Sequence, residues 1–315
     1  MSKDNINSNE SLNQEVALNN ESYTDKDAKV KRHMGMRTKN RIFNIISYIV
    51  LTLISIIWLI PFIFIVLESF RVESTWQTNY VIPKKWGFDN YINLFKDTNF
   101  GKWYGNTLLT AIIVAVVQTI IVLSVSYTLS RLRFKGRKAL MNLMLIFGMF
   151  PGFITLIVLY RVLSDLNMTG PHAVPGLILV YVAGSGMGYY VSKGFFDTIP
   201  KSLDEAARVD GATRFQVFYK IILPLSKPII IYTVLTAFMA PWGDFMFAKY
   251  IAHNSSAGMN VAVGLQGLIS SVGQISFNYT KFCAGGVLVA IPIATLFMLL
   301  QRYYVEGVTG GAVKG

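Results

Sequence analysis

The sequence predicts an all-α polytopic membrane protein with six transmembrane helices. Hydrophobic residues make up 53% of its 315 residues, charged residues only 15%, and the mean hydropathy is +0.45. Ordinary soluble domains carry about 25% charged residues, so this composition indicates a membrane protein. A helix needs about 20 apolar residues to cross the hydrocarbon core, and the chain contains six apolar runs of about that length.

The six runs are separated by polar connections. We place them at Asn44–Leu67, Asn106–Ser130, Ala139–Leu163, Val174–Phe196, Ile221–Ala248 and Phe282–Tyr303. None alternates polar and apolar residues as the strands of an outer-membrane barrel do. Several runs contain prolines, among them Pro61, Pro151, Pro241 and Pro292. Backbone groups freed by a proline need a neighbouring helix or a water-filled cavity, so these prolines indicate either packing kinks or a lined pathway.

Basic residues gather on alternate connections between the runs. They precede the first run, fill the connection after the second, and lie on the connection after the fourth: Lys29, Lys31, Arg32, Arg37, Lys39, Arg41; Arg131, Arg133, Lys135, Arg137, Lys138; Lys193, Lys201, Arg208, Arg214, Lys220. The positive-inside rule then places these connections and both termini on the cytoplasmic side. The net charge of +12 is therefore topological, and we expect no nucleic-acid partner.

Several function classes are excluded by what the sequence lacks. The single cysteine, Cys283, permits no intrachain disulfide, and the scattered residues His33, His172 and His253 form no metal-ligand pattern. No G-x-x-x-x-G-K-[ST] phosphate loop occurs, so we expect neither ATP hydrolysis nor a cofactor on this chain. Residues 1–40 are polar and lack the apolar core of a signal peptide. We expect them to form a disordered cytoplasmic tail.

The connection between the fourth and fifth runs, residues 198–224, is charged and predicts a helix–turn–helix. Ser202 and Glu205 have the S-x-x-E spacing of a capping box that opens a short helix. Asp204 and Glu205 in the first turn suit the helix dipole. Gly211 occurs where this helix would end in a left-handed conformation, and a second short helix is expected to begin near Thr213.

Bilayer insertion alone does not require such a charged segment, so the connection indicates a docking surface. By spacing alone, Glu205 would only cap its own helix. Alanines beside a charge permit close approach of a partner, and a glycine sets the angle between two helices. The combined pattern therefore favours docking, and the candidate contact residues are Glu205, Ala206, Ala207, Asp210, Gly211, Leu223 and Pro224.

This pattern resembles the coupling (EAA) loop of the membrane subunits of binding-protein-dependent ABC importers, where the loop seats the ATPase. Six spans with the loop between the fourth and fifth are similar to the smaller permease subunit of carbohydrate importers, of the maltose/maltodextrin type. Residues 41–305 would form its transmembrane domain. The segment Val261–Leu265 and the glycine-rich residues 306–315 are also similar to that family. The long polar tail of residues 1–40 departs from its pattern.

The resemblance implies a multi-pass permease subunit in a bacterial cytoplasmic membrane that translocates an oligosaccharide, first of all maltose or maltodextrin. It implies a homologous second permease subunit, two ATPase subunits that bind ATP and Mg, and an extracytoplasmic sugar-binding protein. It further implies that a glycine-rich cytoplasmic C-terminal tail contacts the ATPases, through Gly310, Gly311 and Lys314.

Three other functions stay open on the sequence. One is an importer of another sugar, such as a galacto-oligosaccharide. A second is a self-contained secondary carrier, which would need inverted repeats and ionisable residues at mid-membrane. A third is an intramembrane enzyme, which would need paired acids or a metal cluster.

Few polar residues of the spans suggest a substrate site. Asp244 is the clearest ionisable residue near a span and is a functional candidate, while Glu68 and Arg71 could simply pair or snorkel. Residues that could face a sugar or equally contact another helix are Gln118, Tyr127, Asn142, Tyr181 and Tyr189. We therefore assign no substrate-binding residue from the sequence.

Overall fold

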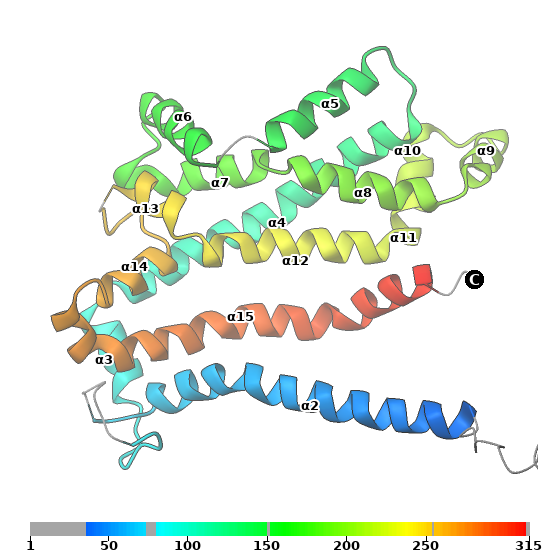
Figure 1. Ribbon diagram of the computed structural model, residues 1–315. Helices are drawn as coiled ribbons and strands as arrows, with labels where there is room; N and C mark the ends of the chain where they lie inside the picture. Colours follow the sequence, from blue (N-terminus) through cyan, green and yellow to red (C-terminus); the bar gives the residue numbers. More distant parts are fainter. Residues whose placement is uncertain (1–35, 74–79, 150–151, 254, 313–315) are drawn as a thin grey trace, which may run out of the picture. The chain divides into compact units, whose positions relative to one another are not determined.

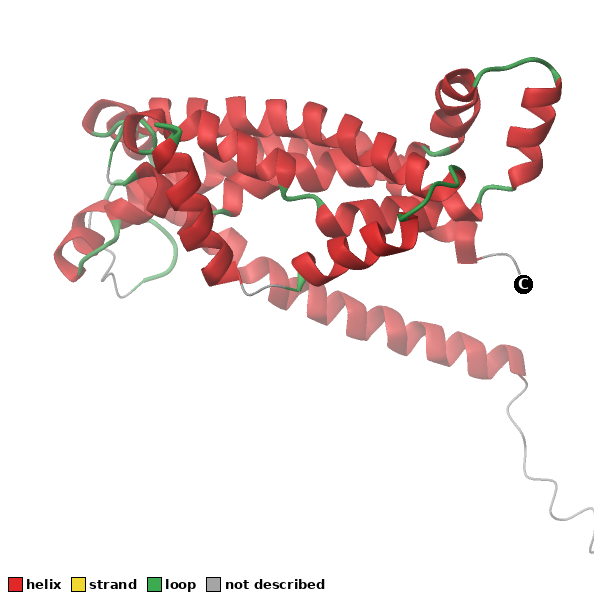
Figure 2. Ribbon diagram, turned by 90° about the horizontal axis from the view of Figure 1, so that it is seen from above, coloured by secondary structure: helices red, strands yellow, loops and turns green. Residues whose placement is uncertain are grey.

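The computed structural model describes residues 36–73, 80–149, 152–253 and 255–312, and within them all regular secondary structure is helical (Figures 1 and 2). One isolated β-bridge joins Arg71 to Trp86. The chain divides into two units, Met1–Phe62 and Ile63–Gly315. This confirms the all-α prediction for the described part of the chain.

The first unit is described only by helix α2 (Met36–Ser69), which begins there and continues into the second unit. Between Asn40 and Phe62 every residue except Ser47 is exposed, although this stretch is among the most apolar in the chain. Such a surface suits contact with lipid. Most of the expected disordered tail, residues 1–35, lies outside the described residues, and residues 36–40 belong to α2.

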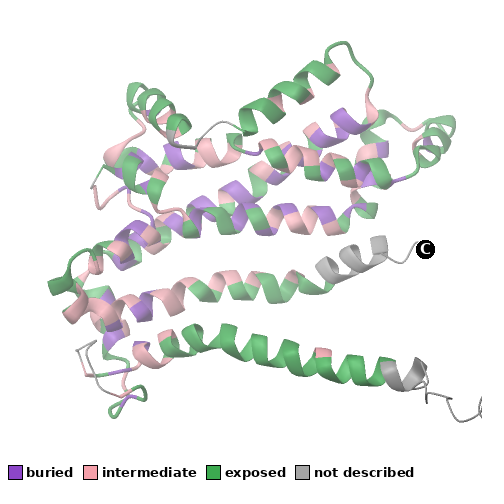
Figure 3. Ribbon diagram, viewed as in Figure 1, coloured by how far each residue is buried: buried purple, intermediate pink, exposed green. Residues whose placement is uncertain are grey.

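The second unit is built around α4 (Phe100–Arg131) and α12 (Lys227–Gly243), which pack against each other. Helix α4 also packs against α7 (Ala173–Ala183) and α8 (Gly186–Thr198), and α12 packs against α15 (Val272–Ala312). Buried residues concentrate on α4 and α12 (Figure 3). The other described helices outside residues 198–225 are α3 (Asp89–Asp97), α5 (Arg137–Gly148), α6 (Gly152–Asp165), η1 (Gly170–His172), α13 (Met246–Ala252) and α14 (Val261–Leu268).

Four described helical segments are long and apolar enough to cross a membrane: Asn40–Ser69, Phe100–Arg131, Gly170–Thr198 and Val272–Arg302. They correspond to the first, second, fourth and sixth predicted runs. The fifth run is a pair of segments, Arg214–Leu225 and Lys227–Gly243, bent by 83°. The predicted run, which starts at Ile221, therefore includes the bend between the two segments. Pro228 stands in the first turn of α12, where its missing N–H costs the helix no hydrogen bond.

The third predicted run, Ala139–Leu163, is described as two shorter helices, α5 and α6. Neither reaches the length of a span by itself. Pro151 lies between them, outside the described residues. Among the described residues, four helices are therefore long enough to be spans, or five when the bent pair is one span.

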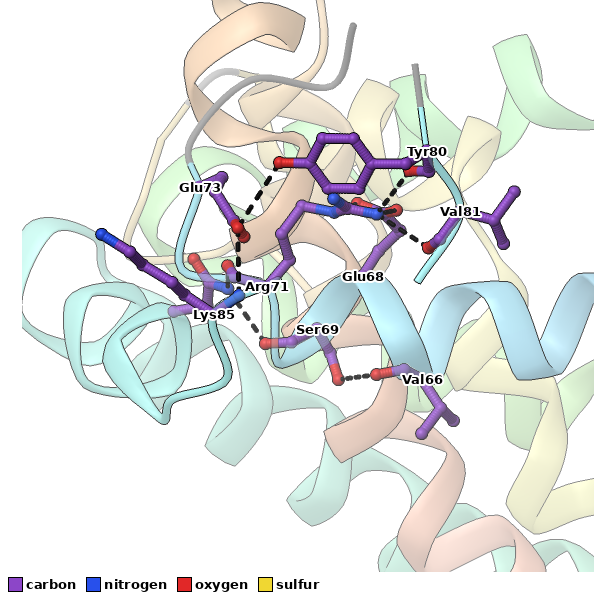
Figure 4. Close-up of polar contacts among 9 residues, drawn as sticks. Val66, Glu68, Ser69, Arg71, Glu73, Tyr80, Val81 and Lys85 are labelled. Carbon is purple, nitrogen blue, oxygen red and sulfur yellow. Dashed lines mark hydrogen bonds and ion pairs between the residues drawn. The ribbon is translucent and has the colours of Figure 1, made fainter. Parts of the chain in front are cut away.

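A buried arginine organises the segment after α2 (Figure 4). Arg71 donates hydrogen bonds of 2.9 and 2.8 Å to the Glu68 carboxylate, and further bonds to the carbonyl oxygens of Tyr80 and Val81 at 3.1 and 2.8 Å. A buried charge needs such partners. Asn90 then links this segment to α15, because its side-chain oxygen accepts a 2.9 Å hydrogen bond from the Thr280 hydroxyl. Pairing, rather than snorkelling, is thus the role of Glu68 and Arg71.

Two glycines of the second unit face α4. Gly188 of α8 faces Val122, and a Cβ added there would lie 3.7 Å from a Val122 methyl group, an ordinary contact distance. Gly264 of α14 lies against the ring of Trp103, where an added Cβ would be 2.1 Å from a ring carbon. The segment that holds Gly264 is therefore pressed directly onto α4.

We predict that Gly264→Ala lowers the free energy of unfolding by about 2 kcal/mol, the usual scale of overpacking in a well-packed core. Gly267→Ala is the matched control on the same helix, because nothing lies within 4 Å of its added Cβ. Unfolding of both variants would be followed in detergent. Equal stability of the two variants would contradict this packing.

Candidate functional site

The docking loop, residues 198–224, connects α8 to α12 and holds four short helical pieces. They are α9 (Lys201–Val209), α10 (Arg214–Val217), the π-helix η2 (Phe218–Ile222) and α11 (Leu223–Leu225). The predicted helix–turn–helix is therefore present, with α9 as its first helix and α10 as the start of the second.

The start of α9 differs from the prediction. The helix begins at Lys201, its N-cap is Pro200, and no side chain caps it. Ser202 is already inside the helix, so the Ser202–Glu205 capping box is wrong. Pro200 has a φ of −57°, which prepares the chain for a helix one residue earlier. Glu205 is consequently not used as a cap, and its carboxylate is exposed.

The end of α9 is a Schellman motif, as the glycine position predicted. Gly211 has a φ of +84°, which is the left-handed region that glycine adopts without penalty. Its N–H donates to the carbonyl of Arg208 at 3.1 Å, and the N–H of Ala212 donates to the carbonyl of Ala207 at 2.9 Å. These two bonds satisfy the last carbonyl groups of the helix and fix the turn toward α10.

A reciprocal capping box opens α10 at Thr213. The Gln216 N–H donates to the Thr213 hydroxyl at 3.3 Å, and the Thr213 N–H donates to the Gln216 side-chain oxygen at 2.7 Å. The pattern T-x-x-Q carries this signal in the sequence. The structure thus confirms the predicted helix start near Thr213. The capping box opens the second helix of the loop, whereas the sequence predicted one at the first helix.

The inner face of the docking loop is apolar and packs against the spans. Ala207, Val217 and Ile222 are buried together with Ile199 of the same loop and with residues of α4, α8 and α12: Leu123, Tyr127, Phe196 and Ile229. Leu223 packs against the same cluster. Ala207 is therefore buried within this chain, and Leu223 is partly buried in it.

The outer face of the docking loop holds the other candidate contacts. Glu205, Ala206, Asp210, Gly211 and Pro224 are all exposed. Large apolar side chains are exposed beside them, with Val209 at 87%, Phe215 at 73% and Tyr219 at 63%. The rings of Phe215 and Tyr219 stack at 6.4 Å. Exposed apolar side chains grouped around a carboxylate are typical of an interaction surface.

Arg131, the last residue of α4, attaches the docking loop to this span. Its guanidinium donates to the Ile199 carbonyl at 2.8 Å and forms a 2.9 Å ion pair with the Asp204 carboxylate. The Arg131 side chain is 4% exposed and that of Asp204 is 16% exposed. Burial raises the pKa of Asp204, while the charge of Arg131 opposes this effect. The stability of this ion pair therefore depends on the close contact of the two charges.

Two residues of this attachment were not recognised from the sequence. Arg131 was counted with the charges that set the topology, and Tyr127 with the residues that could face a sugar. The Tyr127 ring lies 4.7 Å from that of Phe218, and its hydroxyl donates to the Arg214 carbonyl at 3.3 Å. A basic residue at a helix C-terminus gives a weak signal for such a role, because it is equally typical of a span end.

A second site is a cavity of about 620 Å³ beside α4. Its polar lining comes from Gln118, Thr155, Tyr181 and Asp244. Two of the sugar-facing candidates, Gln118 and Tyr181, therefore line it, whereas Tyr127, Asn142 and Tyr189 do not. The volume is in the range of small-molecule sites.

Asp244 is held at this cavity by the break between α12 and α13. Its carboxylate accepts hydrogen bonds from the Tyr181 hydroxyl and from the N–H of Phe247. Asn260 donates to the Asp244 carbonyl at 2.6 Å and to the Pro241 carbonyl at 3.2 Å. Backbone carbonyls at the broken helix end are thus satisfied by a side chain of another segment.

The glycine-rich C-terminus lies partly within the described residues. Helix α15 continues to Ala312 and includes Gly310 and Gly311. Lys314 lies outside the described residues. The sixth predicted run, Phe282–Tyr303, is therefore the middle of the longer helix α15. The glycine-rich residues up to Ala312 continue this helix.

Comparisons with known proteins agree with this geometry. The family model described as the binding-protein-dependent transport system inner membrane component matches residues 120–310. The maltodextrin transport system permease protein MdxG of Bacillus subtilis (strain 168) is 36% identical over 283 residues, which are 90% of this chain and 100% of the relative. The galactooligosaccharides transport system permease protein GanQ of the same strain is 34% identical, over 92% of this chain and 99% of the relative.

One solved structure has the same fold. It is a crystal structure of a bacterial ABC transporter involved in the import of the acidic polysaccharide alginate. It matches with a TM-score of 0.70 at 22% identity, and covers 84% of this chain and 98% of that chain. This likeness shows the overall fold of most of the chain.

We predict that Gly211→Val loosens the end of α9. A left-handed conformation costs a non-glycine residue about 1–2 kcal/mol, so hydrogen exchange at the Ala212 amide should accelerate about 5–30-fold. Gly211→Asn is the matched control, because asparagine tolerates this conformation. Nothing lies within 4 Å of the added Cβ, so a clash cannot explain the effect. Wild-type exchange in Gly211→Val would contradict the motif's role.

Proposed function

This chain belongs to the family of binding-protein-dependent transport system inner membrane components, and we propose that it is the permease subunit of an ATP-driven sugar importer. The observation that carries the proposal is the docking loop, with an inner face packed on the spans and an outer face that is exposed. The 36% identity to a maltodextrin permease over nearly the whole chain supports an oligosaccharide of the maltodextrin class as cargo. A galacto-oligosaccharide is the second candidate, because that relative is nearly as similar.

The proposal includes six spans with both termini in the cytoplasm. Helices α5 and α6 would together form the third span, interrupted near Pro151, and the bent pair would form the fifth. The basic residues around Arg133 and Arg208 support a cytoplasmic position of both connections. The docking loop then lies on the cytoplasmic side, where ATP is available.

The proposed assembly contains a homologous second permease subunit, two ATPase subunits and an extracytoplasmic sugar-binding protein. ATP and Mg would bind to the ATPase subunits, and this chain would bind neither. Closure of the ATPases would push on the exposed face around Glu205 and Phe215. Because Arg131 attaches the docking loop to α4, the spans would follow as a rigid body and switch access between the two sides.

The cavity beside α4 is the proposed position of sugar contact on this chain. Sugar binding sites combine aromatic faces with groups that exchange hydrogen bonds with hydroxyls, and Tyr181, Asp244 and Gln118 provide these groups. The end of α15 with Gly310 and Gly311 is proposed to reach the ATPase interface, with Lys314 beyond it. Its support is the continuation of a span helix up to Ala312.

The cargo is tested on the assembled complex by measuring sugar-dependent ATP hydrolysis with a panel of sugars. We predict that maltodextrins, presented by the binding protein, stimulate hydrolysis and uptake more strongly than galacto-oligosaccharides. The reverse order would assign the second candidate. Uptake driven by an ion gradient, with no ATPase subunit that co-purifies, would show a secondary carrier and refute the proposal.

We predict that Glu205→Lys abolishes co-purification of the ATPase and lowers uptake at least about tenfold, because charge reversal places like charges against a partner cation. Insertion in the membrane should be unchanged, since Glu205 is exposed and makes no cap. Asp165→Lys, at an exposed acid on α6, is the charge-matched control. Normal uptake in Glu205→Lys would refute docking through this face.

The topology is tested by thiol labelling of single cysteines at Lys135, Arg208 and Ser270, all of which are exposed. We predict external labelling at position 270, and labelling at 135 and 208 only after permeabilisation. The native Cys283 is buried and should stay silent. External labelling at 208 would overturn the cytoplasmic position of the docking loop.

A further inference from the structure

A polar pocket of about 420 Å³ lies between the end of α4 and the docking loop. It is separate from the cavity that contains Asp244 and differs from it in charge. Five cationic residues line it, Arg131, Arg133, Lys201, Arg208 and Arg214, together with the two carboxylates of Asp204 and Glu205. The lining therefore carries an excess of three positive charges.

Most of this positive charge has no ion-pair partner in the described part of the chain. Within the described residues, the ion pairs include Arg131 with Asp204 but give none to Arg133, Lys201, Arg208 or Arg214. Cations around a partly enclosed pocket repel each other more strongly than they would in open water. An anion in the pocket would relieve this repulsion.

The floor of the pocket contains buried groups that lack hydrogen-bond partners. The Arg131 side chain is only 4% exposed. Its Nη2 donates to Ile199 and its Nε lies 2.9 Å from Asp204, but Nε and Nη1 make no hydrogen bond among the described residues. One oxygen of Asp204, Oδ1, is also buried without a hydrogen-bond partner there. Buried polar groups are nearly always satisfied, so Arg131 lacks an acceptor for Nη1 and Asp204 lacks a donor for Oδ1.

A single ligand class supplies both missing partners. A phosphate group offers oxygens that match the guanidinium fork, and a hydroxyl on or next to that phosphate can donate to Asp204. We propose that this pocket binds a hydroxyl-bearing phosphate, held by Arg131 at its floor and by Arg133 and Arg208 at its rim. Two sources have this chemistry: the headgroup of phosphatidylglycerol and free protonated phosphate.

The position of the pocket suits a lipid headgroup. Arg131 is the last residue of the 32-residue helix α4, so the pocket lies where this span leaves the membrane. Basic pockets at the cytoplasmic ends of spans are typical sites for anionic headgroups. Since Glu205 of the docking face lines the same pocket, a bound phosphate would touch the element that we propose to contact the ATPase.

Native mass spectrometry of the full chain tests the site without any transport assay. The detergent-solubilised protein is titrated with phosphatidylglycerol, with phosphatidylcholine and with inorganic phosphate. Binding of phosphatidylglycerol but not phosphatidylcholine supports a lipid source. Binding of inorganic phosphate, with displacement of phosphatidylglycerol, supports the free anion. A failure to bind any of the three overturns the proposal and leaves the transport function unaffected.

The double variant Arg133→Gln/Arg208→Gln should weaken phosphate binding at least about tenfold, since hydrogen bonds to charged groups are the strong ones. Both residues are exposed at the rim, so folding should be preserved.

The control is Lys138→Gln/Lys220→Gln, which removes the same charge from exposed residues outside this pocket's lining. Equal weakening in both double variants would show unspecific attraction. Loss of phosphate binding in the assembled complex would show that a partner's acidic side chain fills the pocket. Either result overturns the site.

Discussion

The contact between Arg131 and the docking loop is the interaction on which the rest of this account depends. A loop of short helical pieces between two long spans has no core of its own to hold it. Its inner face is buried against the spans through Ala207, Val217 and Ile222, but apolar packing is not directional. The bonds from Arg131 to Ile199 and Asp204 fix the orientation of α9. They decide which residues are left exposed for a partner.

The same helix connects the two candidate sites. Gln118 of α4 lines the cavity that contains Asp244. Arg131, 13 residues further along the same helix, ends it at the docking loop. At 1.5 Å per residue these positions are about 20 Å apart along one rigid element. Tyr127, between them, packs against the loop through Phe218. A movement imposed on the loop would therefore reach the cavity through α4 without any intermediate element that could absorb it.

The sequence predicted those features that depend on local chemistry. Long apolar runs gave the helices, and Gly211 marked the end of α9, because only glycine adopts φ = +84° freely. The start of α9 was wrong because Pro200 preceded the expected cap, and the T-x-x-Q box at Thr213 was overlooked. The partners of Arg131 and the pairing of Asp244 with Tyr181 join segments distant in sequence. No local pattern records such contacts. The bend between Leu225 and Lys227 does have a local signal, because Ser226, Lys227 and Pro228 interrupt the apolar run there.

The central claim, that Arg131 makes α4 and the docking loop one rigid body, is tested most directly by a distance measurement. Spin labels at the half-buried position Thr128 and the exposed position Lys220 would report the distance between span and loop in the assembled complex, with and without ATP. The account predicts one narrow distribution that ATP does not shift, and a broad distribution in Arg131→Gln. A shift on addition of ATP, or an unchanged narrow distribution in Arg131→Gln, would contradict it.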